Sequence, residues 1–378
     1  MIYRKLGRTG YSVSQLGFGA MRLPMTEIDG VKVVDRSLAI PMIHRAYEKG
    51  LNYIDSAVGY CNEDSQRAVG EAVRSWRETH PDPEYPIIVS TKNHYYGEDE
   101  KAWWQHLENS LERLGLDSIN IYNHHGINWK RYEEDVAPRV SKWMQKAKDQ
   151  GLIQHICTSF HDDVDALKRL IDSGYVESIT MQYNLLYRDL EEGIAYAGEK
   201  GVGVVIMGPV AGGRLAGPSD VLQNLVPGVK RVPELALRFV LSNPNVTVAL
   251  SGMGTLQMVE ENTAIAADAI SLTAEDRLMI QEHVTQLAEM ANLYCTGCKY
   301  CQPCPEEVNI PYIFEMYNMG KVYGLWDIAR ENYANFPEQR WQGGKQADAC
   351  IECGLCEDKC PQHIKIREQL KQAHLALG

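Results

Sequence analysis

Eight of the ten cysteines in this 378-residue chain fall in its last quarter, as two closely spaced runs. Proline follows the last cysteine of each run, and the remaining two, Cys61 and Cys157, stand alone. In order, the runs are Cys295, Cys298, Cys301 and Cys304, then Cys350, Cys353, Cys356 and Cys360. Short loops that carry three or four thiols each restrict this region to a small fold built around sulfur or metal chemistry.

The gaps within the runs are those of an iron–sulfur protein. The second run is spaced as Cys-x2-Cys-x2-Cys-x3-Cys-Pro, the spacing of bacterial two-cluster ferredoxins, and the first run is one residue shorter. In that pattern the fourth cysteine of each run binds the cluster held by the other run. We therefore predict two 4Fe-4S clusters, one bound by Cys295, Cys298, Cys301 and Cys360 and the other by Cys350, Cys353, Cys356 and Cys304.

Two other uses of these thiols are open. Structural zinc is also bound by four thiolates, but zinc knuckles supply them two at a time from separated segments. Disulfides need an oxidising compartment, and nothing in the sequence points to one. Iron, sulfide and zinc analysis of the protein would distinguish these alternatives.

The composition is that of a globular protein with an acidic balance. Hydrophobic residues make up 44% of the chain, charged residues 23%, and the formal net charge is −12. A chain this acidic, without a basic run, is a poor ligand for nucleic acid or a membrane surface. No segment has the pattern of a signal peptide or the ~20 apolar residues of a membrane span. We therefore expect a cytoplasmic protein that binds neither nucleic acid nor membranes.

From residue 15 to about residue 267, short apolar runs alternate with longer amphipathic stretches. The apolar runs are predicted strands, at Gln15–Gly19, Asn52–Ser56, Ile87–Thr91, Ser118–Asn123, Ile153–Thr158, Ser178–Gln182, Gly203–Met207 and Thr247–Leu250. The amphipathic stretches are predicted helices, at Leu38–Lys49, Glu63–Trp76, Asp99–Leu114, Lys130–Gln150, Asp163–Ser173, Asp189–Lys200, Val232–Leu241 and Leu256–Ala266. Eight strand–helix repeats are the count of an α/β fold of the (β/α)8 TIM barrel type. A doubly wound sheet is the alternative, but the Gly-rich fingerprint expected after its first strand is missing.

The cysteine runs follow this barrel as a second domain. Thr273, with Asp276 three residues later, is suited to cap a helix over Ala274–Asn292. A further helix is expected over Pro311–Tyr333, and a short hairpin over residues 2–13 precedes the first strand. We therefore predict a barrel domain over residues 1–272 and a small, mainly α-helical, ferredoxin-like domain over residues 273–378.

Side chains with acid–base chemistry follow three consecutive predicted strands. Asp55 lies at the end of the second strand and Tyr60 follows it, Lys92 follows the third strand and His125 the fourth, with His124 as the alternative. Barrel enzymes keep their active sites where the C-terminal ends of the strands meet. An ammonium beside a phenol favours its ionised form, and an imidazole can donate a hydrogen bond to a carbonyl oxygen. Such a set can protonate a carbonyl oxygen while hydride reaches the carbon.

These residues resemble a known catalytic set. Asp55-Ser-Ala-x-x-Tyr60, Ser90-Thr-Lys92 and the strand that ends at His125 are similar to the tetrad of the aldo/keto reductase family, over roughly residues 1–270. The resemblance implies that Tyr60 is the proton donor, that Lys92 and Asp55 tune it, and that His125 orients the carbonyl. The whole chain resembles the branch of that family that is fused to a C-terminal domain with two 4Fe-4S clusters.

The resemblance also implies a nicotinamide nucleotide, NADP(H) or NAD(H), bound after strands five to eight. The residues expected to contact it are Ser159, Gln182, Gly208, Val210, Gly252, Met253, Gly254, Glu261 and Asn262. Three family features are absent. Phe160 replaces an Asn, Met207 replaces an aromatic that stacks on nicotinamide, and no basic residue reads a 2′-phosphate near Gln257. The glycine-rich loops can still bind phosphate, and FMN would fit there too.

The sequence thus predicts an iron–sulfur oxidoreductase that reduces a small-molecule carbonyl or oxidises the alcohol, with clusters that relay electrons. Nicotinamide moves a two-electron hydride and a cluster moves single electrons, so a flavin could join the two halves. A ferredoxin- or flavodoxin-type partner could also supply electrons. The alternatives are an electron-transfer or regulatory protein with a non-catalytic barrel, a flavin-dependent enzyme on the same barrel, and a barrel enzyme whose cysteine domain is a zinc-held interaction module.

Overall fold

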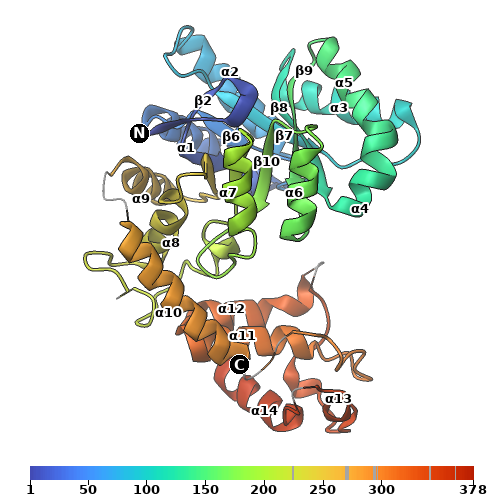
Figure 1. Cartoon of the computed structure of the whole chain (residues 1–378), viewed down its shortest axis with the longest axis vertical. Coiled ribbons are helices and arrows are strands. Elements are labelled where there is room, and N and C mark those ends of the chain that lie inside the picture. The colour runs from blue at the N-terminus through green and yellow to red at the C-terminus, as the bar shows by residue number, and fades with distance from the viewer. Residues whose placement is uncertain (224, 269–271, 293–294, 296, 340–341, 362) are drawn as a thin grey trace. The chain divides into compact units, whose positions relative to one another are not determined.

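The computed structural model describes residues 1–223, 225–268, 272–292, 295, 297–339, 342–361 and 363–378 (Figure 1). By its internal contacts the chain divides into two compact units. The first comprises Met1–Pro209 and Leu237–Ser271, and the second comprises Val210–Ala236 and Leu272–Gly378. The sequence-based ranges, 1–272 and 273–378, assign residues 210–236 to the barrel, whereas the contacts group them with the C-terminal residues.

The first unit is a closed barrel of eight parallel strands, which confirms the predicted fold class. Each strand pairs with the next along the chain, and the last pairs with the first, Ala249 lying opposite Leu16. All eight predicted strands are present, within a few residues at each end. They are β3 (Leu16–Gly19), β6 (Tyr53–Asp55), β7 (Ile88–Asn93), β8 (Ile119–Ile127), β9 (Ile153–Phe160), β10 (Ser178–Gln182), β11 (Gly203–Met207) and β12 (Val248–Ser251).

Helices follow the strands and lie outside the ring that the strands form (Figure 1). They are α1 (Arg36–Glu48), α2 (Ser65–Thr79), α3 (Glu100–Leu114), α6 (Val164–Asp172), α7 (Glu191–Glu199), α8 (Val232–Leu241) and α9 (Leu256–Ala267). The segment after β8 was predicted as one helix over Lys130–Gln150, which is wrong. It comprises α4 (Trp129–Arg131), a π-helix η3 (Tyr132–Val140) and α5 (Ser141–Asp149). Pro138 lies inside η3 and has no N–H, so α-helical hydrogen bonding cannot continue through it.

The N-terminal half of the barrel interior is filled with apolar side chains. Tyr53, Ile88, Ile121 and Val205 belong to one buried cluster. The predicted N-terminal hairpin closes this end, with β1 (Tyr3–Lys5) paired to β2 (Ser12–Ser14) and Leu6 and Val13 added to the same cluster. Polar residues such as Ser90 and Asn123 are buried nearer the opposite end. A polar site inside the barrel can therefore lie only at the C-terminal ends of the strands.

A second hairpin, β4 (Met25–Ile28) and β5 (Val31–Val34), interrupts the connection from β3 to α1 and was not predicted. Its turn is Asp29-Gly30, with φ of 53° and 77°. Asp-Gly between β-branched residues is a hairpin signal. The strands were missed because their apolar side chains, including Ile28 and Val31, are exposed and do not continue the buried pattern of the barrel.

The second unit is mainly helical. Its helices are α10 (Ala274–Asn292), α11 (Ile310–Tyr323), α12 (Trp326–Asn335), α13 (Leu355–Asp358) and α14 (Ile366–Leu377). Thr273 and Asp276 cap α10 reciprocally, as predicted. The predicted helix Pro311–Tyr333 is instead two helices, because Gly324 takes the left-handed conformation (φ 67°) that ends α11. Residues 210–236 are tied to α11 by Arg214–Glu315, with a nitrogen–oxygen distance of 2.6 Å.

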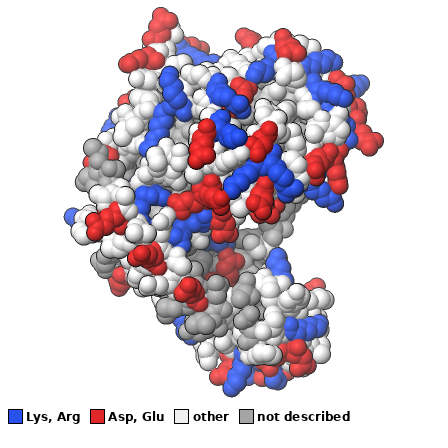
Figure 2. Space-filling model, viewed as in Figure 1, with Lys and Arg blue, Asp and Glu red and all other residues white. Residues whose placement is uncertain are grey.

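Acidic and basic side chains are intermingled over the face shown in Figure 2. On the described residues of that face, neither sign of charge forms one continuous patch. Within the part of the chain that the structure describes, no helix combines the length and the apolar character needed to traverse a lipid bilayer.

Candidate active site and cysteine cavities

The C-terminal ends of β6 and β7 hold a buried ion pair. Lys92 donates from Nζ to Asp55 Oδ1 and, at 2.8 Å, to the Ser56 carbonyl oxygen. Asp55 Oδ2 accepts from Ser90 Oγ at 2.8 Å. Both charged side chains are at most 4% exposed. Burial by itself would lower the pKa of Lys92, but Asp55 and Tyr60 outweigh burial and raise this pKa above its ordinary value. The ammonium is therefore charged at neutral pH.

Tyr60 and His125 stand beside this ion pair. The ammonium nitrogen of Lys92 lies 5.0 Å from the centroid of the Tyr60 ring. The ring of His125, from the end of β8, lies 6.4 Å from the Tyr60 ring, centroid to centroid, and almost perpendicular to it. The structure thus brings Asp55, Tyr60, Lys92 and His125 together at one end of the barrel. The arrangement offers a phenol proton, a fixed positive charge next to it, and an imidazole.

The two adjacent histidines of β8 have different surroundings. Successive side chains of a strand point to opposite faces, and it is His125 that faces Tyr60. His124 is buried, and its Nε2 lies 2.9 Å from the Tyr175 hydroxyl. Burial lowers the pKa of His124 to about 3. Burial, with a smaller contribution from Lys92, lowers the pKa of His125 to about 4, so both imidazoles are neutral at pH 7.

His125 lies on an irregularity in β8. The β8–β9 register shifts between His124 and Ile127, so β8 carries an extra residue there, as in a β-bulge. Three side chains hold this bulge. The Gly126 N–H donates to Ser159 Oγ at 2.8 Å, Tyr96 Oη donates to the His125 carbonyl at 3.0 Å, and Arg131 donates to the Gly126 carbonyl at 2.8 Å. The bulge-holding roles of Tyr96 and Arg131 were not predicted, because both residues lie in the connections after β7 and β8, where the pattern of strands and helices carries no information.

The residues expected to contact a nucleotide lie at the C-terminal ends of β9 and β10 and in the segments after β11 and β12. Ser159 is buried and accepts from the bulge, whereas Gln182 is exposed at the end of β10. The Gly208 carbonyl accepts from Asn184 at 3.0 Å. After β12, Met253 is buried, Asn262 donates to Ser251 at 3.0 Å and Glu261 accepts from Gln257 at 2.9 Å. Val210 belongs to the second compact unit.

A basic residue that was not predicted lies beside the Gly252-Met-Gly254 turn. A Cβ at Gly252 would stand 3.2 Å from Arg22 Cδ, and a Cβ at Gly254 would stand 3.2 Å from the Arg22 carbonyl oxygen. Arg22 ends η2 (Ala20–Arg22), directly after β3. The two glycines therefore leave room for Arg22 at a loop where phosphate binding was expected.

The cysteine runs of the second unit surround two cavities. One cavity is bordered by Cys295, Cys298, Cys301 and Cys360. The other is bordered by Cys304, Cys350, Cys353 and Cys356, and also by Cys301. Each set of four that the spacing assigns to one cluster thus borders one cavity. Over the described residues, no three or more His, Cys, Asp or Glu side chains form a group that could hold a single metal ion.

The two cysteine runs share one backbone conformation. Each run has three residues with positive φ at matching places. One lies two residues after the first cysteine, one directly after the second cysteine, and one three residues after the last cysteine. These positions are Gly297, Lys299 and Glu307 in the first run, and Glu352, Gly354 and His363 in the second. The N–H of Gly297 lies 3.4 Å from Cys295 Sγ, and that of Glu352 lies 3.4 Å from Cys350 Sγ.

The likeness of the two runs extends into the helices. Helix α11 begins six residues after Cys304, and α14 begins six residues after Cys360. The second unit therefore contains an internal repeat of a cysteine run and the start of the helix that follows, which is longer than the paired cysteine runs that the sequence indicated. Such cysteine loops, with backbone N–H groups turned towards sulfur, have the donor set of 4Fe-4S clusters.

Comparison with known proteins assigns both parts of the chain. The model of the aldo/keto reductase family matches residues 15–227, more than half of the chain, and that of the 4Fe-4S dicluster domain matches residues 294–364. The oxidoreductase YqkF of Bacillus subtilis is 25% identical over 319 residues, which cover 75% of this chain and 96% of that protein. The NADH-specific methylglyoxal reductase of Escherichia coli is 24% identical over 330 residues, which cover 73% of this chain and 96% of that protein.

A solved structure has the same barrel. The holo form of the aldo-keto reductase AKR11C1 from Bacillus halodurans is similar with a TM-score of 0.63 and 28% identity, over 75% of this chain and 96% of that chain. The family match, the closed barrel and the cysteine repeat agree with one another. The protein therefore belongs to the aldo/keto reductase family of oxidoreductases, in the branch that carries a 4Fe-4S domain behind its barrel.

Proposed function

We propose that the barrel reduces a carbonyl group of a small molecule to an alcohol, or catalyses the reverse reaction, with Tyr60 as proton donor. The observation that carries this proposal is the position of the Lys92 ammonium, 5.0 Å from the Tyr60 ring and paired to Asp55. As hydride reaches the carbonyl carbon, the oxygen gains negative charge and takes the phenol proton. The ammonium then stabilises the negative charge left on the phenol oxygen.

His125 orients the carbonyl. A neutral imidazole has one ring nitrogen that donates and one that accepts. The low pKa of His125 keeps its imidazole neutral at pH 7. A neutral donor can bind the carbonyl oxygen without competing with Tyr60 for delivery of the proton. The hydrogen bonds from Ser159 and Arg131 to Gly126 hold the bulge, and thereby hold the His125 ring at its centroid distance of 6.4 Å from the Tyr60 ring.

The hydride donor in this proposal is a nicotinamide nucleotide. The Escherichia coli relative, whose name states that it uses NADH and acts on methylglyoxal, supports a nicotinamide and a small carbonyl substrate. The candidate contacts are Ser159, Gln182, Gly208, Val210, Gly252, Met253, Gly254, Glu261 and Asn262. Because Phe160 and Met207 depart from the family pattern, direct measurement has to choose between NADP(H), NAD(H) and FMN.

The second unit is proposed to hold two 4Fe-4S clusters, each bound by the four cysteines that border one cavity. The chemistry that such clusters supply is the transfer of single electrons. Cys298 and Cys353 are exposed, which supports exchange of electrons between the proposed clusters and a ferredoxin- or flavodoxin-type protein.

The test of the barrel's function is carbonyl-dependent oxidation of NADPH and NADH by protein purified without air. Wild type, Tyr60→Phe and the control Tyr95→Phe are compared. The Tyr95 hydroxyl accepts from the Asp99 N–H at 3.2 Å. Loss of the Tyr60 proton should lower kcat by roughly 10²- to 10⁴-fold, with little change in the control. If Tyr60→Phe retains the wild-type rate, or if no carbonyl is reduced with any donor, the barrel is not a reductase of this type.

Metal analysis of the same preparation tests the second unit. Two 4Fe-4S clusters require about eight irons and about eight sulfides per chain. Two zinc ions without sulfide would assign the cysteines to structural sites instead. Flavin released on denaturation would identify FMN as a bound cofactor.

A further inference from the structure

The turn after Tyr60 has an unusual backbone. Cys61, Asn62 and Glu63 have φ of 51°, 55° and 65°, in the left-handed region that favours glycine. Consecutive residues other than glycine persist there only where the surrounding structure fixes them. The Ser65 N–H closes the turn on the Tyr60 carbonyl at 3.3 Å. Whatever fixes this turn therefore also fixes the backbone of Tyr60.

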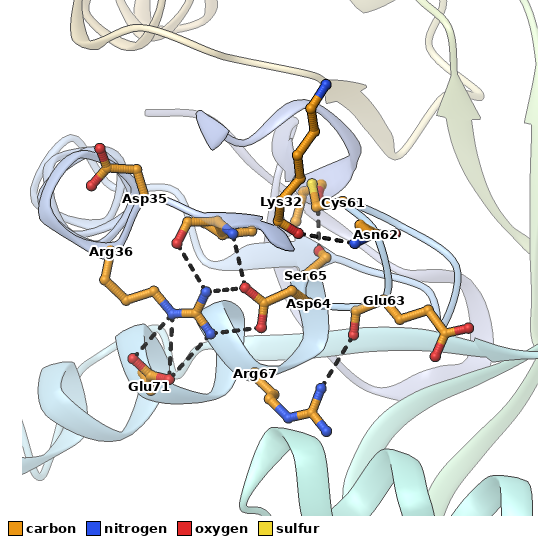
Figure 3. A network of polar contacts seen from close by, with 12 residues as sticks. Lys32, Asp35, Arg36, Cys61, Asn62, Glu63, Asp64, Ser65, Arg67 and Glu71 are labelled. Carbon is orange, nitrogen blue, oxygen red and sulfur yellow. Dashed lines mark hydrogen bonds and ion pairs between the residues drawn. The ribbon is translucent and has the colours of Figure 1, made fainter. Parts of the chain in front are cut away.

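Asp64 ties the end of the turn to the hairpin β4–β5 and to α1 (Figure 3). Its side chain is 11% exposed, and its Oδ2 accepts from the Val34 N–H at 2.8 Å. The Arg36 guanidinium contacts both carboxylate oxygens, with an Nη2–Oδ1 distance of 2.8 Å. Arg36 also donates to the Val34 carbonyl at 3.0 Å and pairs with Glu71 at 3.3 Å. We call Arg36, Asp64 and the Val34 N–H the hairpin brace.

The ion pair of the brace is charged at neutral pH. Burial alone would raise the pKa of Asp64, but hydrogen bonds from Arg36 and from the Val34 N–H outweigh burial and hold this pKa below its ordinary value. Its hydrogen bonds to Asp64 raise the pKa of Arg36. A two-point contact between a guanidinium and a carboxylate is both strong and directional. The brace therefore fixes an orientation as well as a distance.

Further contacts join the same elements. Asn62, inside the turn, donates to the Lys32 carbonyl of β5 at 3.0 Å, so the hairpin meets the turn at a second point (Figure 3). Ser65, after the turn, donates to the Ala20 carbonyl at 2.8 Å. These are single hydrogen bonds. Glu63, inside the turn, also pairs with Arg113 at 3.1 Å, but the Glu63 side chain is 62% exposed, whereas the Arg36 and Asp64 side chains are 27% and 11% exposed.

We propose that Arg36 and Asp64 are positioning residues for Tyr60. Their ion pair, set on the hairpin β4–β5, holds the left-handed turn and thereby keeps the phenol beside Lys92. Neither residue touches the reacting groups, and both act through the backbone of residues 61–63. The inference rests on the proposed function to the extent that Tyr60 is the proton donor.

The test uses Arg36→Met, Asp64→Asn and the conservative Arg36→Lys in the full-length protein. The control is Arg45→Met, which removes ion pairs of another arginine on the same helix, to Glu48 and Glu260. Hydrogen exchange of residues 57–66, measured by mass spectrometry, reports the turn without reference to activity. Carbonyl reduction reports kcat, KM and the solvent isotope effect, and thermal unfolding reports stability.

Arg36→Met and Asp64→Asn should speed exchange in residues 57–66. Each should lower kcat by roughly 10- to 100-fold, because a misplacement of about 1 Å has that cost, with KM nearly unchanged and a larger solvent isotope effect. Arg36→Lys should recover part of kcat, since it keeps the charge but loses the two-point geometry. Arg45→Met should leave exchange and kcat unchanged.

Equal exchange of residues 57–66 in Arg36→Met and Arg45→Met would overturn the inference. So would faster exchange with an unchanged kcat, or a kcat that falls only as the folded fraction falls. Faster exchange in a protein whose wild type reduces no carbonyl would leave the brace standing as the support of the turn, and the failure would belong to the proposed function.

Discussion

Replacing Lys92 with methionine separates the contribution of the buried ion pair to stability from its contribution to catalysis. Lys92 and Asp55 have side chains 3% and 4% exposed. Without the ammonium, the Asp55 carboxylate keeps one hydrogen bond, from Ser90. Removal of one member of a buried pair leaves an uncompensated charge, which costs about 3–5 kcal/mol. Asp55→Asn alone should cost a similar amount, because the ammonium then loses its anion.

The double variant Lys92→Met/Asp55→Asn should be more stable than either single variant. No charge is left buried, and the remaining loss is a Ser56 carbonyl without its donor, which costs about 1–3 kcal/mol. Carbonyl reduction should nevertheless stay lost, because the positive charge beside Tyr60 is gone. The second substitution is thus expected to restore stability without restoring activity.

The assay is urea unfolding followed by tryptophan fluorescence. Five of the seven tryptophans, the last of them Trp143, precede residue 210, so the signal reports chiefly the barrel. A loss below about 1 kcal/mol in Lys92→Met, or a double variant less stable than both single variants, would contradict the buried pairing. Turnover in the double variant would remove Lys92 from the proposed chemistry.

Three other perturbations give expected outcomes. His124 has its pKa lowered from 6.5 to about 3, so the unfolded chain binds its proton first, and stability should fall by up to about 5 kcal/mol as pH drops from 6.5 towards 3. Unfolding of His124→Gln should show a smaller dependence, because His125, whose pKa is lowered to about 4, still contributes, while His80→Gln, at an exposed site, should keep the full dependence. Ser159→Ala leaves the Gly126 N–H without its acceptor. It should destabilise the barrel by about 1–3 kcal/mol and lower kcat. An unchanged stability together with a raised KM for the nucleotide would contradict the bulge-holding role. Cys295→Ser/Cys360→Ser should lose about four of about eight irons, and Cys350→Ser/Cys360→Ser should lose all, because the second pair spans both clusters; equal losses would refute the assignment.

The barrel and the place of its polar site could be predicted because both follow from local pattern. Short apolar runs between amphipathic stretches mark the eight strands, and parallel strands bring their C-terminal ends together. Asp55, Lys92 and His125 each lie within two residues of the C-terminal end of a strand, so the topology alone makes them neighbours. The spacing of the cysteines is equally local, and it predicted the partition around the two cavities.

The features that were missed depend on contacts between distant residues. Asn62 is the one residue of Cys61-Asn62-Glu63 that favours positive φ, and glycine, the usual signal, is absent. The Arg36–Asp64 pair spans 28 residues and depends on a hairpin with exposed apolar side chains. The full length of the repeat in the second unit was missed because the first cysteine run is one residue shorter than the second. The first three cysteines of the two runs are therefore 55 residues apart and the last cysteines 56 residues apart.

Three members of the proposed tetrad are held by different physical causes, and this makes their roles separable. Lys92 is held by a buried opposite charge, His125 by hydrogen bonds to a bulge, and Tyr60 by a turn fixed through Arg36. Replacing Lys92 should mainly lower stability, and a second substitution that neutralises Asp55 should restore part of this loss. Loss of the Arg36 contacts that fix the turn should lower kcat at little cost in stability, since the Arg36 side chain is 27% exposed. Proteins with the same four side chains can therefore differ widely in rate, because the residues that aim those side chains lie outside the strands that carry them.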